Sequence, residues 1–340
     1  MSILEDLKKT LAGEAPASPV VLPIAIEEYM TNKCGVPYRA FSTDVDKAFS
    51  VWDYAIHKYG IDAALIFIDD FFEYETFGLE LVSPENSPRA CVKYIAPSAE
   101  WLSRARIPTF EEGRFPVRAG LVNKLRKRWG DDLLVCASVA APFTGATLLY
   151  GIADTMLLFY DDERLLEDTM AFTSALSIAC SKRLIEAGAN MIWYGDCAAS
   201  SKFIDAAKFD RFLFEPTRSA IEQIKALGAT VVYHANENKA AHIERMARLK
   251  ADIVSCGEHT SMPELYDAAG GECCLMGNLD PIQGIMNGTV ESIRALVARQ
   301  RDMMAGRSKY IVNTGEGITT KTTEENFRAF LDACRETGVF

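Results

Sequence analysis

Residues 230–255 read TVVYHANENKAAHIERMARLKADIVS and contain the clearest pattern of strands and helices in the chain. Two short apolar runs, Thr230–His234 and Ala251–Ser255, flank the amphipathic stretch Lys239–Leu249, which has the length of a helix. The apolar character of both runs is continuous, which is typical of strands covered on both faces. Parallel strands need a crossover connection, and a helix is the usual one. The segment therefore predicts a strand–helix–strand unit of a parallel sheet.

The same alternation extends along the whole chain of 340 residues. The predicted strands are Pro19–Ile24, Ala63–Ile68, Leu133–Val139, Asn190–Tyr194, Thr230–His234, Ala251–Ser255, Cys274–Gly277 and Lys309–Asn313. The predicted helices are Asp44–Lys58, Arg118–Arg128, Leu165–Ala187, Pro216–Leu227, Lys239–Leu249, Ser261–Ala269, Thr289–Met304 and Glu324–Glu336.

Eight such units predict an α/β fold of the (βα)8 TIM-barrel class, as a single domain over residues 1–340. The spare residues then form an N-terminal extension and an insertion between Phe71 and Gly113, after the second strand. A doubly wound open sheet is the alternative, although no GxGxxG turn follows the first strand.

Composition excludes several classes of function. Lys and Arg number 36 against 47 Asp and Glu, and the net charge of −11 argues against nucleic acid or an anionic membrane as the main partner. No signal peptide begins the chain, and the longest apolar runs are shorter than the ~20 residues of a membrane helix. The nine cysteines lack CxxC spacing and fit reduced thiols. We expect a cytoplasmic enzyme without a membrane partner.

Polar and titratable residues follow nearly every predicted strand, where a barrel has its active site. They are Asp69, Asp70, Asp196, Cys197, His234, Asn236, Glu237, Glu258, His259, Asn278, Asp280, Asn313 and Glu316. Asp and Asn also end strands because they favour turns and helix caps, which is the alternative interpretation. Histidine has no such preference, yet two of the four histidines stand here. The nitrogen and oxygen donors of this set are ligands that Zn²⁺ accepts, and a solvated group of charges is the competing explanation.

Five motifs, taken in order, resemble those of a known family. They are APFTGATLLYG (141–151), EAGANMIWYGDCAASS (186–201), VVYHANEN (231–238), LMGNLDP (275–281) with Gly288 and Thr289, and VNTGEGI (312–318) with TEENFRAFLDA (323–333). Together they resemble the uroporphyrinogen decarboxylase superfamily, and most closely its corrinoid-dependent methyltransferase branch, which includes methylcobamide:coenzyme M methyltransferases and O-demethylases. The resemblance implies a (βα)8 barrel, in agreement with the pattern of strands and helices.

The decarboxylase branch is matched only in part. FIDDFFEYETFG (67–78) places Asp69 where that branch keeps a pyrrole-binding aspartate. The arginine-rich N-terminal signature of that branch is missing, because VVLPIAIEEYM (20–30) carries Glu27 and Glu28 instead. A porphyrinogen with many carboxylates needs cationic partners, so decarboxylation of uroporphyrinogen is disfavoured.

The methyltransferase branch ligates zinc through His-x-Cys and a later cysteine. Here His234 matches the histidine, whereas Asn236 and Glu316 stand at the two cysteine positions. The resemblance therefore implies a zinc site at His234 and Glu316, completed by Glu258, Glu237 or Asn236. Without the two thiolates the ion is harder and more Lewis-acidic, which favours an oxygen ligand. Loss of the metal altogether is the competing explanation.

The resemblance also implies roles for further residues. Asp196, Asp69 and Tyr194 are the predicted catalytic residues, with the two aspartates orienting or protonating the leaving oxygen. Tyr194, Trp193, Phe143 and Phe72 are expected to wall an apolar pocket, with core packing as the alternative. The chain has no DxHxxG cobalamin motif, so a partner protein is expected to bring the corrinoid.

The leading hypothesis is metal-assisted transfer of a methyl group between an oxygen-linked donor, of the methoxyaromatic or methanol class, and a corrinoid protein. The partners expected are that corrinoid protein and a small methylated substrate, with a homodimer left open. The alternatives are a uroporphyrinogen decarboxylase-like lyase, a methylcobamide:thiol methyltransferase, and a non-enzymatic protein that binds corrinoid or tetrapyrrole.

Overall fold

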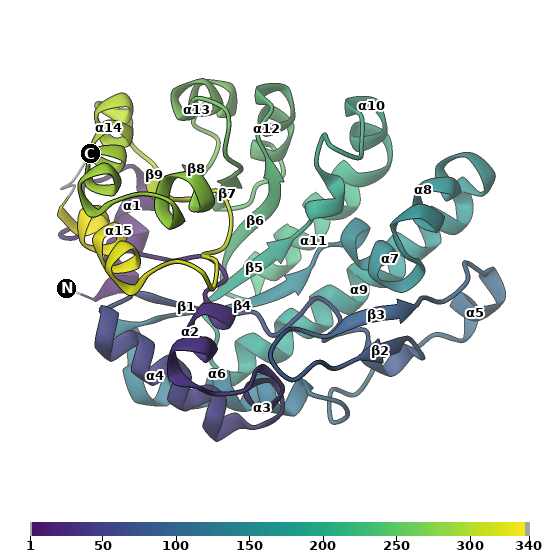
Figure 1. Ribbon diagram of the computed structural model, residues 1–340. Helices are drawn as coiled ribbons and strands as arrows, with labels where there is room; N and C mark the ends of the chain where they lie inside the picture. Colours follow the sequence, from purple (N-terminus) through teal and green to yellow (C-terminus); the bar gives the residue numbers. More distant parts are fainter. Residues whose placement is uncertain (1, 337–340) are drawn as a thin grey trace.

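The computed structural model describes residues 2–336 and shows a curled parallel sheet surrounded by helices (Figure 1). The sheet strands are β1 (Ala63–Ile66), β4 (Leu134–Ala140), β5 (Met191–Gly195), β6 (Thr230–Glu237), β7 (Ile253–Cys256), β8 (Cys274–Leu279) and β9 (Tyr310–Thr314). These seven strands pair in that order, and every pairing is parallel. The fold is α/β and TIM-barrel-like, as the alternation of strands and helices predicts.

The helices lie mostly between successive strands and cover the outside of the sheet (Figure 1). They are α1 (Ile3–Ala12), α2 (Glu27–Cys34), α3 (Tyr38–Thr43), α4 (Val45–Tyr59), α5 (Ala99–Arg104), α6 (Phe115–Trp129), α7 (Pro142–Tyr150), α8 (Ile152–Asp161), α9 (Glu163–Ala187), α10 (Ala206–Lys208), α11 (Phe214–Ala226), α12 (Ala240–Ala247), α13 (Met262–Ala269), α14 (Val290–Met304) and α15 (Glu324–Glu336). Each of the eight predicted helices corresponds to one of these, with ends shifted by up to three residues.

The prediction of a first strand at Pro19–Ile24 is wrong. Residues 19–24 form no strand, although they run beside the start of β1: the Asp62 N–H donates to the Val21 carbonyl at 3.1 Å, and the Val21 N–H donates to Asp62 Oδ2 at 2.8 Å. On the other side, Asn313 Nδ2 of β9 donates to the Leu22 carbonyl. Pro19 and Pro23 lack the N–H that a ladder requires, which explains why the segment makes only isolated bonds.

Side chains fill the interior of the sheet as they do in a barrel. The inner cluster takes alternate residues of each strand together with the N-terminal segment: Val20, Leu22, Ile24, Ala63, Leu65, Leu134, Cys136, Met191, Trp193, Val232, Ile253, Cys274, Met276 and Ile311. The intervening residues belong to a second cluster between the sheet and the helices. Residues 19–24 thus occupy the gap between β1 and β9 without strand pairing.

The chain between β1 and α6 is long and partly irregular. It contains a short 3-10 helix (η1, Glu75–Phe77), the antiparallel pair β2 (Glu80–Val82) and β3 (Ala90–Lys93), and α5. Within residues 2–336 no single helix is long and apolar enough to span a membrane. Helices α7 and α8 pass that test only as a pair, and they meet at an angle of 108°.

Candidate active site

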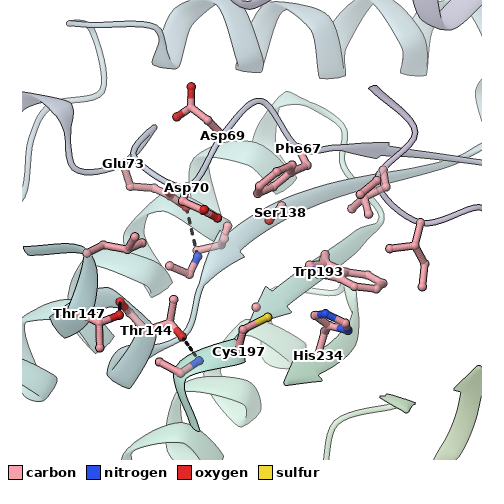
Figure 2. Close-up of a pocket in the computed structure, with 18 of the residues that line it drawn as sticks. Phe67, Asp69, Asp70, Glu73, Ser138, Thr144, Thr147, Trp193, Cys197 and His234 are labelled. Carbon is pink, nitrogen blue, oxygen red and sulfur yellow. Dashed lines mark hydrogen bonds between the residues drawn. The ribbon is translucent and has the colours of Figure 1, made fainter. Parts of the chain in front are cut away.

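A cavity of about 400 Å³ opens at the carboxyl ends of β1, β4, β5 and β6 (Figure 2). Its lining is mainly apolar, with Leu65, Phe67, Val139, Leu148 and Trp193 among the residues that form it. The position is the one expected from the barrel, because strand ends and the loops after them build the site. The volume lies in the range of small-molecule sites, roughly 300–1,000 Å³.

Three potential metal ligands meet at one side of this cavity. Cys197, His234 and Glu316 each offer one ligand atom, and these atoms all lie within 4.8 Å of one another. His234 Nε2 is 3.5 Å from Glu316 Oε1. Cys197 follows β5, His234 lies within β6 and Glu316 follows β9, so three separate strand ends supply sulfur, nitrogen and oxygen.

Neighbouring groups fix the orientation of His234. Its Nδ1 lies 3.0 Å from Ser255 Oγ, which leaves Nε2 facing Glu316. The Trp193 ring packs against the imidazole with 4.7 Å between centroids. A ligand histidine is commonly held in this way, with one ring nitrogen bonded to a protein group and the other free for the ion.

The electrostatics of the cluster favour a cation at this point. Burial disfavours a charged imidazole, yet the Cys197 and Glu316 side chains outweigh it and raise the pKa of His234 to about 10. Burial likewise disfavours a charged Glu316, but His234 outweighs it and lowers the pKa of that carboxyl. A metal ion competes with the proton for such a donor set.

The donor atoms of the cluster are of the types that zinc binds. Cysteine sulfur, histidine nitrogen and carboxylate oxygen are all accepted by Zn²⁺, and catalytic zinc sites use three protein ligands plus an open position. Cys197 is exposed, and all three donors line the cavity, so a further ligand can reach the cluster from the cavity.

The other three predicted metal ligands lie outside this cluster. Asn236 donates from Nδ2 to Glu316 Oε1 and so positions a ligand. The buried Glu237 carboxylate accepts from Ser201 Oγ at 2.9 Å and from three backbone N–H groups, and these bonds join the turn after β5 to the residues that precede α12. Glu258 lies beside Gly315, and its Oε2 is buried without a hydrogen-bond partner among the described residues.

Two of the three predicted catalytic residues turn away from the cavity. The buried Asp196 carboxylate accepts from the Thr144 N–H at 3.0 Å and from the Tyr233 hydroxyl at 2.8 Å. Tyr194 faces the helix layer, where its hydroxyl lies 2.8 Å from Ser177 Oγ. The physical reason is the alternation along β5, which turns Trp193 inward and Tyr194 outward.

Asp69 lines the cavity, but both of its carboxylate oxygens bind Arg114, at 2.6 and 3.0 Å. Arg114 also donates from Nε to Glu75 Oε2 at 2.9 Å. Asp69 therefore anchors the irregular chain between β1 and α6. Of the four predicted wall aromatics, Trp193 lines the cavity, whereas Phe143 packs on Phe159 and Phe72 packs on Phe115. Phe67 and Phe203 contribute the other aromatic rings of the lining.

Sequence reasoning missed Cys197 as a ligand and did not consider Glu73. Cys197 follows a predicted strand directly, but neither of the two family cysteine positions falls on it; those positions are Asn236, which lies outside the cluster, and Glu316, which lies within it. Glu73 carried no sequence signal, because it lies in an irregular turn after β1.

Comparison with known proteins places the chain. The family model described as uroporphyrinogen decarboxylase (URO-D) matches residues 4–337. The chain belongs to the uroporphyrinogen decarboxylase family. One relative of the chain is a methylated-thiol–coenzyme M methyltransferase from Methanosarcina mazei. It is 27% identical over 288 residues, which cover 82% of this chain and 74% of the relative.

A second relative is the methylcobamide:CoM methyltransferase MtbA of Methanosarcina acetivorans, 21% identical over 97% of this chain and 95% of the relative. Among solved structures, a methyltransferase from Methanosarcina mazei superposes with a TM-score of 0.86 over 99% of both chains, at 20% identity. That superposition supports the TIM-barrel-like fold of this URO-D family member.

Proposed function

We propose that this URO-D family protein is a methyltransferase that moves a methyl group between a small methylated compound and a corrinoid carried by a partner protein. The observation that carries the proposal is the Cys197, His234 and Glu316 cluster at the side of an apolar cavity. The names of two relatives support it, since both are methyltransferases and one acts on a methylcobamide.

We further propose that the cluster holds Zn²⁺ and that the methyl donor is oxygen-linked, of the methoxyaromatic or methanol class. A bound divalent ion supplies Lewis acidity toward the leaving oxygen. The chain's own groups do the rest: Ser255 and Trp193 orient His234, Asn236 orients Glu316, and the apolar walls exclude water from the methyl group. Glu258 remains a candidate for a fourth ligand because of its unpartnered Oε2.

A methylcobamide:thiol methyltransferase is the second candidate, and Cys197 favours it. One thiolate makes the ion softer than the all-nitrogen-and-oxygen set expected from sequence. Nitrogen and oxygen still supply two of the three donors, which keeps the oxygen-linked donor as the first choice.

The charges around the cavity do not support the decarboxylase alternative. The lining carries four acids, Asp69, Asp70, Glu73 and Glu316, against two basic side chains. These are His234, which is bound up with Glu316, and Arg118, whose guanidinium donates to the Ile66 and Ser138 carbonyls. Glu27, from the N-terminal segment, is buried and accepts from the Phe67 N–H at 2.9 Å. A substrate with many carboxylates would meet repulsion here.

The test combines metal analysis with methyl transfer. Purified wild type is expected to carry about one zinc per chain, and Cys197→Ser, His234→Ala and Glu316→Gln are each expected to lower zinc affinity by at least about tenfold. Cys34→Ser, which changes a cysteine outside the cluster, is the matched control. Full zinc content in all three cluster variants contradicts the metal site.

Methyl transfer to reduced cobalamin is then measured with methanol, methoxyphenols and methylated thiols as donors. Activity with the oxygen-linked donors, lost in the cluster variants, supports the proposal. Activity with methylated thiols alone favours the second candidate, and spectral binding of cobalamin without turnover favours a corrinoid-binding protein. Four features stay predictions: a single domain over residues 1–340, an insertion at 71–113, a cytoplasmic location and a homodimer.

A further inference from the structure

A buried carboxyl group lies on the cavity wall away from the Cys197, His234 and Glu316 cluster. Figure 2 shows Glu73 and Asp70 on one side of the pocket and Cys197 and His234 on the other. Glu73 lies in the irregular turn after β1, and its side chain is only 4% exposed. A carboxyl group this deeply buried is costly unless other groups compensate for its charge.

Three groups face the Glu73 carboxyl: its own backbone N–H, the Ala140 N–H and Arg118. The Ala140 N–H, at the end of β4, donates to Oε1 at 3.3 Å. Arg118 Nη1 lies 3.9 Å from the same oxygen, which is beyond hydrogen-bonding distance. A carboxyl group offers about four acceptor positions on two oxygens. The observed contacts leave Glu73 with acceptor capacity on the cavity side.

The other acidic groups of the lining differ in this respect. Both oxygens of Asp69 are bound to Arg114, and Glu316 is occupied by His234 and Asn236. Asp70 lies beside Glu73 and is more exposed as a residue, so water reaches it more readily, although burial still raises the pKa of its carboxyl to about 6. Glu73 is thus the buried acid of this wall that is available to a ligand.

The charges around Glu73 restrict the kind of group that it receives. Arg118 offsets the charge of the carboxyl, so a cationic group would meet the arginine as well as the acid. An anionic group would meet Glu73 and the nearby Asp69. Burial raises the pKa of Glu73 to about 7 although Arg118 opposes the shift, so near neutral pH the carboxyl is about half protonated. A neutral hydroxyl group suits both protonation states, because it can donate to the carboxylate and accept from the acid.

We propose that Glu73 determines substrate specificity by hydrogen bonding to a hydroxyl group of the substrate, at the end away from the methyl group. The substrate class is then a small methyl ether with a hydroxyl group, such as a methoxyphenol, whose ring packs on Phe67, Val139 and Leu148. This proposal rests on the methyl-transfer function above for the identity of the reacting group. It assigns binding of the hydroxyl group to the side of the cavity across from the Cys197, His234 and Glu316 cluster.

The test measures binding without turnover. Isothermal titration calorimetry compares 2-, 3- and 4-methoxyphenol with methoxybenzene on the zinc-loaded wild type. At least one methoxyphenol is expected to bind roughly tenfold more tightly, the size of one buried hydrogen bond. Glu73→Leu is expected to abolish the preference, whereas Glu73→Gln keeps an acceptor and retains most of it. Glu14→Gln, an exposed acid far along the sequence, is the matched control.

The wild-type comparison keeps the proposal falsifiable even if Glu73→Leu fails to fold. Equal binding of the methoxyphenols and methoxybenzene, or no binding of either, overturns it. A preference that persists in Glu73→Leu also overturns it. The binding measurement contains no corrinoid, so it does not depend on methyl transfer. If the protein prefers the methoxyphenols but transfers no methyl group, the hydroxyl-binding role of Glu73 is supported and the proposed reaction is contradicted.

Discussion

Adjacent residues of a strand face opposite sides of the sheet, one toward the cavity and the other toward the helices. His234 reaches the cluster and Tyr233, one residue earlier, lies in the layer between sheet and helices, where it donates to Asp196. The same alternation separates Trp193 from Tyr194. A one-residue step along a strand therefore decides whether a side chain takes part in chemistry or in packing.

Glu27 provides a prediction at the residue scale. Burial raises the pKa of its carboxyl from 4.5 to about 8, although the Phe67 N–H and Arg118 oppose the shift and Glu28 adds to it. Between these two values the folded state binds more protons than the unfolded state, so stability falls as pH rises through the window. Glu27→Gln removes the titrating proton and keeps an oxygen for Phe67.

Glu27→Gln is accordingly expected to raise the free energy of unfolding at pH 9 by on the order of 3 kcal/mol, with little change at pH 5. Urea unfolding at pH 5, 7 and 9 measures the difference, with Glu14→Gln as the control. A gain that is the same at all three pH values would show that charge burial at Glu27 is not its cause.

At the scale of elements, the turn after β5 is tied to the start of α7. Asp196 accepts from Thr144, in the first turn of α7, and from Tyr233 of β6, while Thr144 Oγ1 accepts from the Ala198 N–H at 3.2 Å. These bonds place Cys197 on the cavity side of the turn. Burial raises the pKa of Asp196 to about 6. We propose that Asp196 positions the metal cluster and that Tyr194 packs the helix layer.

Asp196→Ala is expected to lower the free energy of unfolding by about 2–4 kcal/mol, because it leaves two buried donors without partners. Tyr194→Phe loses one hydroxyl contact, to Ser177, and is expected to cost about 1 kcal/mol. Chemical denaturation compares the two variants. If Asp196→Asn were as stable as wild type but transferred no methyl group, Asp196 would have a catalytic role.

At the scale of the whole molecule, the barrel-like sheet is completed by a segment that is not a strand. Val20, Leu22 and Ile24 extend into the interior cluster, and backbone and side-chain bonds join the segment to residues beside β1 and in β9. Contacts of such long sequence separation couple the N-terminal residues to the last strand. The interior packing therefore depends on both ends of the described chain.

Leu22→Ala tests this closure. Leu22 is 2% exposed, and its truncation is expected to lower the free energy of unfolding by about 2–5 kcal/mol. Val82→Ala, at a position 43% exposed in β2, is expected to change it by no more than about 0.5 kcal/mol. Thermal and urea unfolding compare the two variants. Equal stability of both would mean that residues 19–24 do not seal the interior.

Some residues of the candidate site could be predicted from the sequence. His234 and Glu316 were predicted as ligands because each follows or ends an apolar run; His234 matches the histidine of a family motif, and Glu316 stands at the position of a family cysteine. Cys197 was named as a strand-end residue but not as a ligand, since nothing local shows that the turn after β5 brings its sulfur to His234. Glu73 and the pairing of Asp69 with Arg114 depend on the irregular chain between β1 and α6, which has no periodicity to read.

The order of strands and helices, the parallel sheet and the end of the sheet at which polar side chains gather can all be predicted from the amino-acid pattern. Periodicity is a local property, so 3.6- and 2-residue patterns are visible without the fold. Which polar residues meet depends on the folded arrangement, because the cluster joins residues as far apart in the chain as Cys197 and Glu316. That arrangement also decides that residues 19–24 complete the barrel without strand pairing, since two prolines prevent a ladder that the hydrophobic pattern alone predicts.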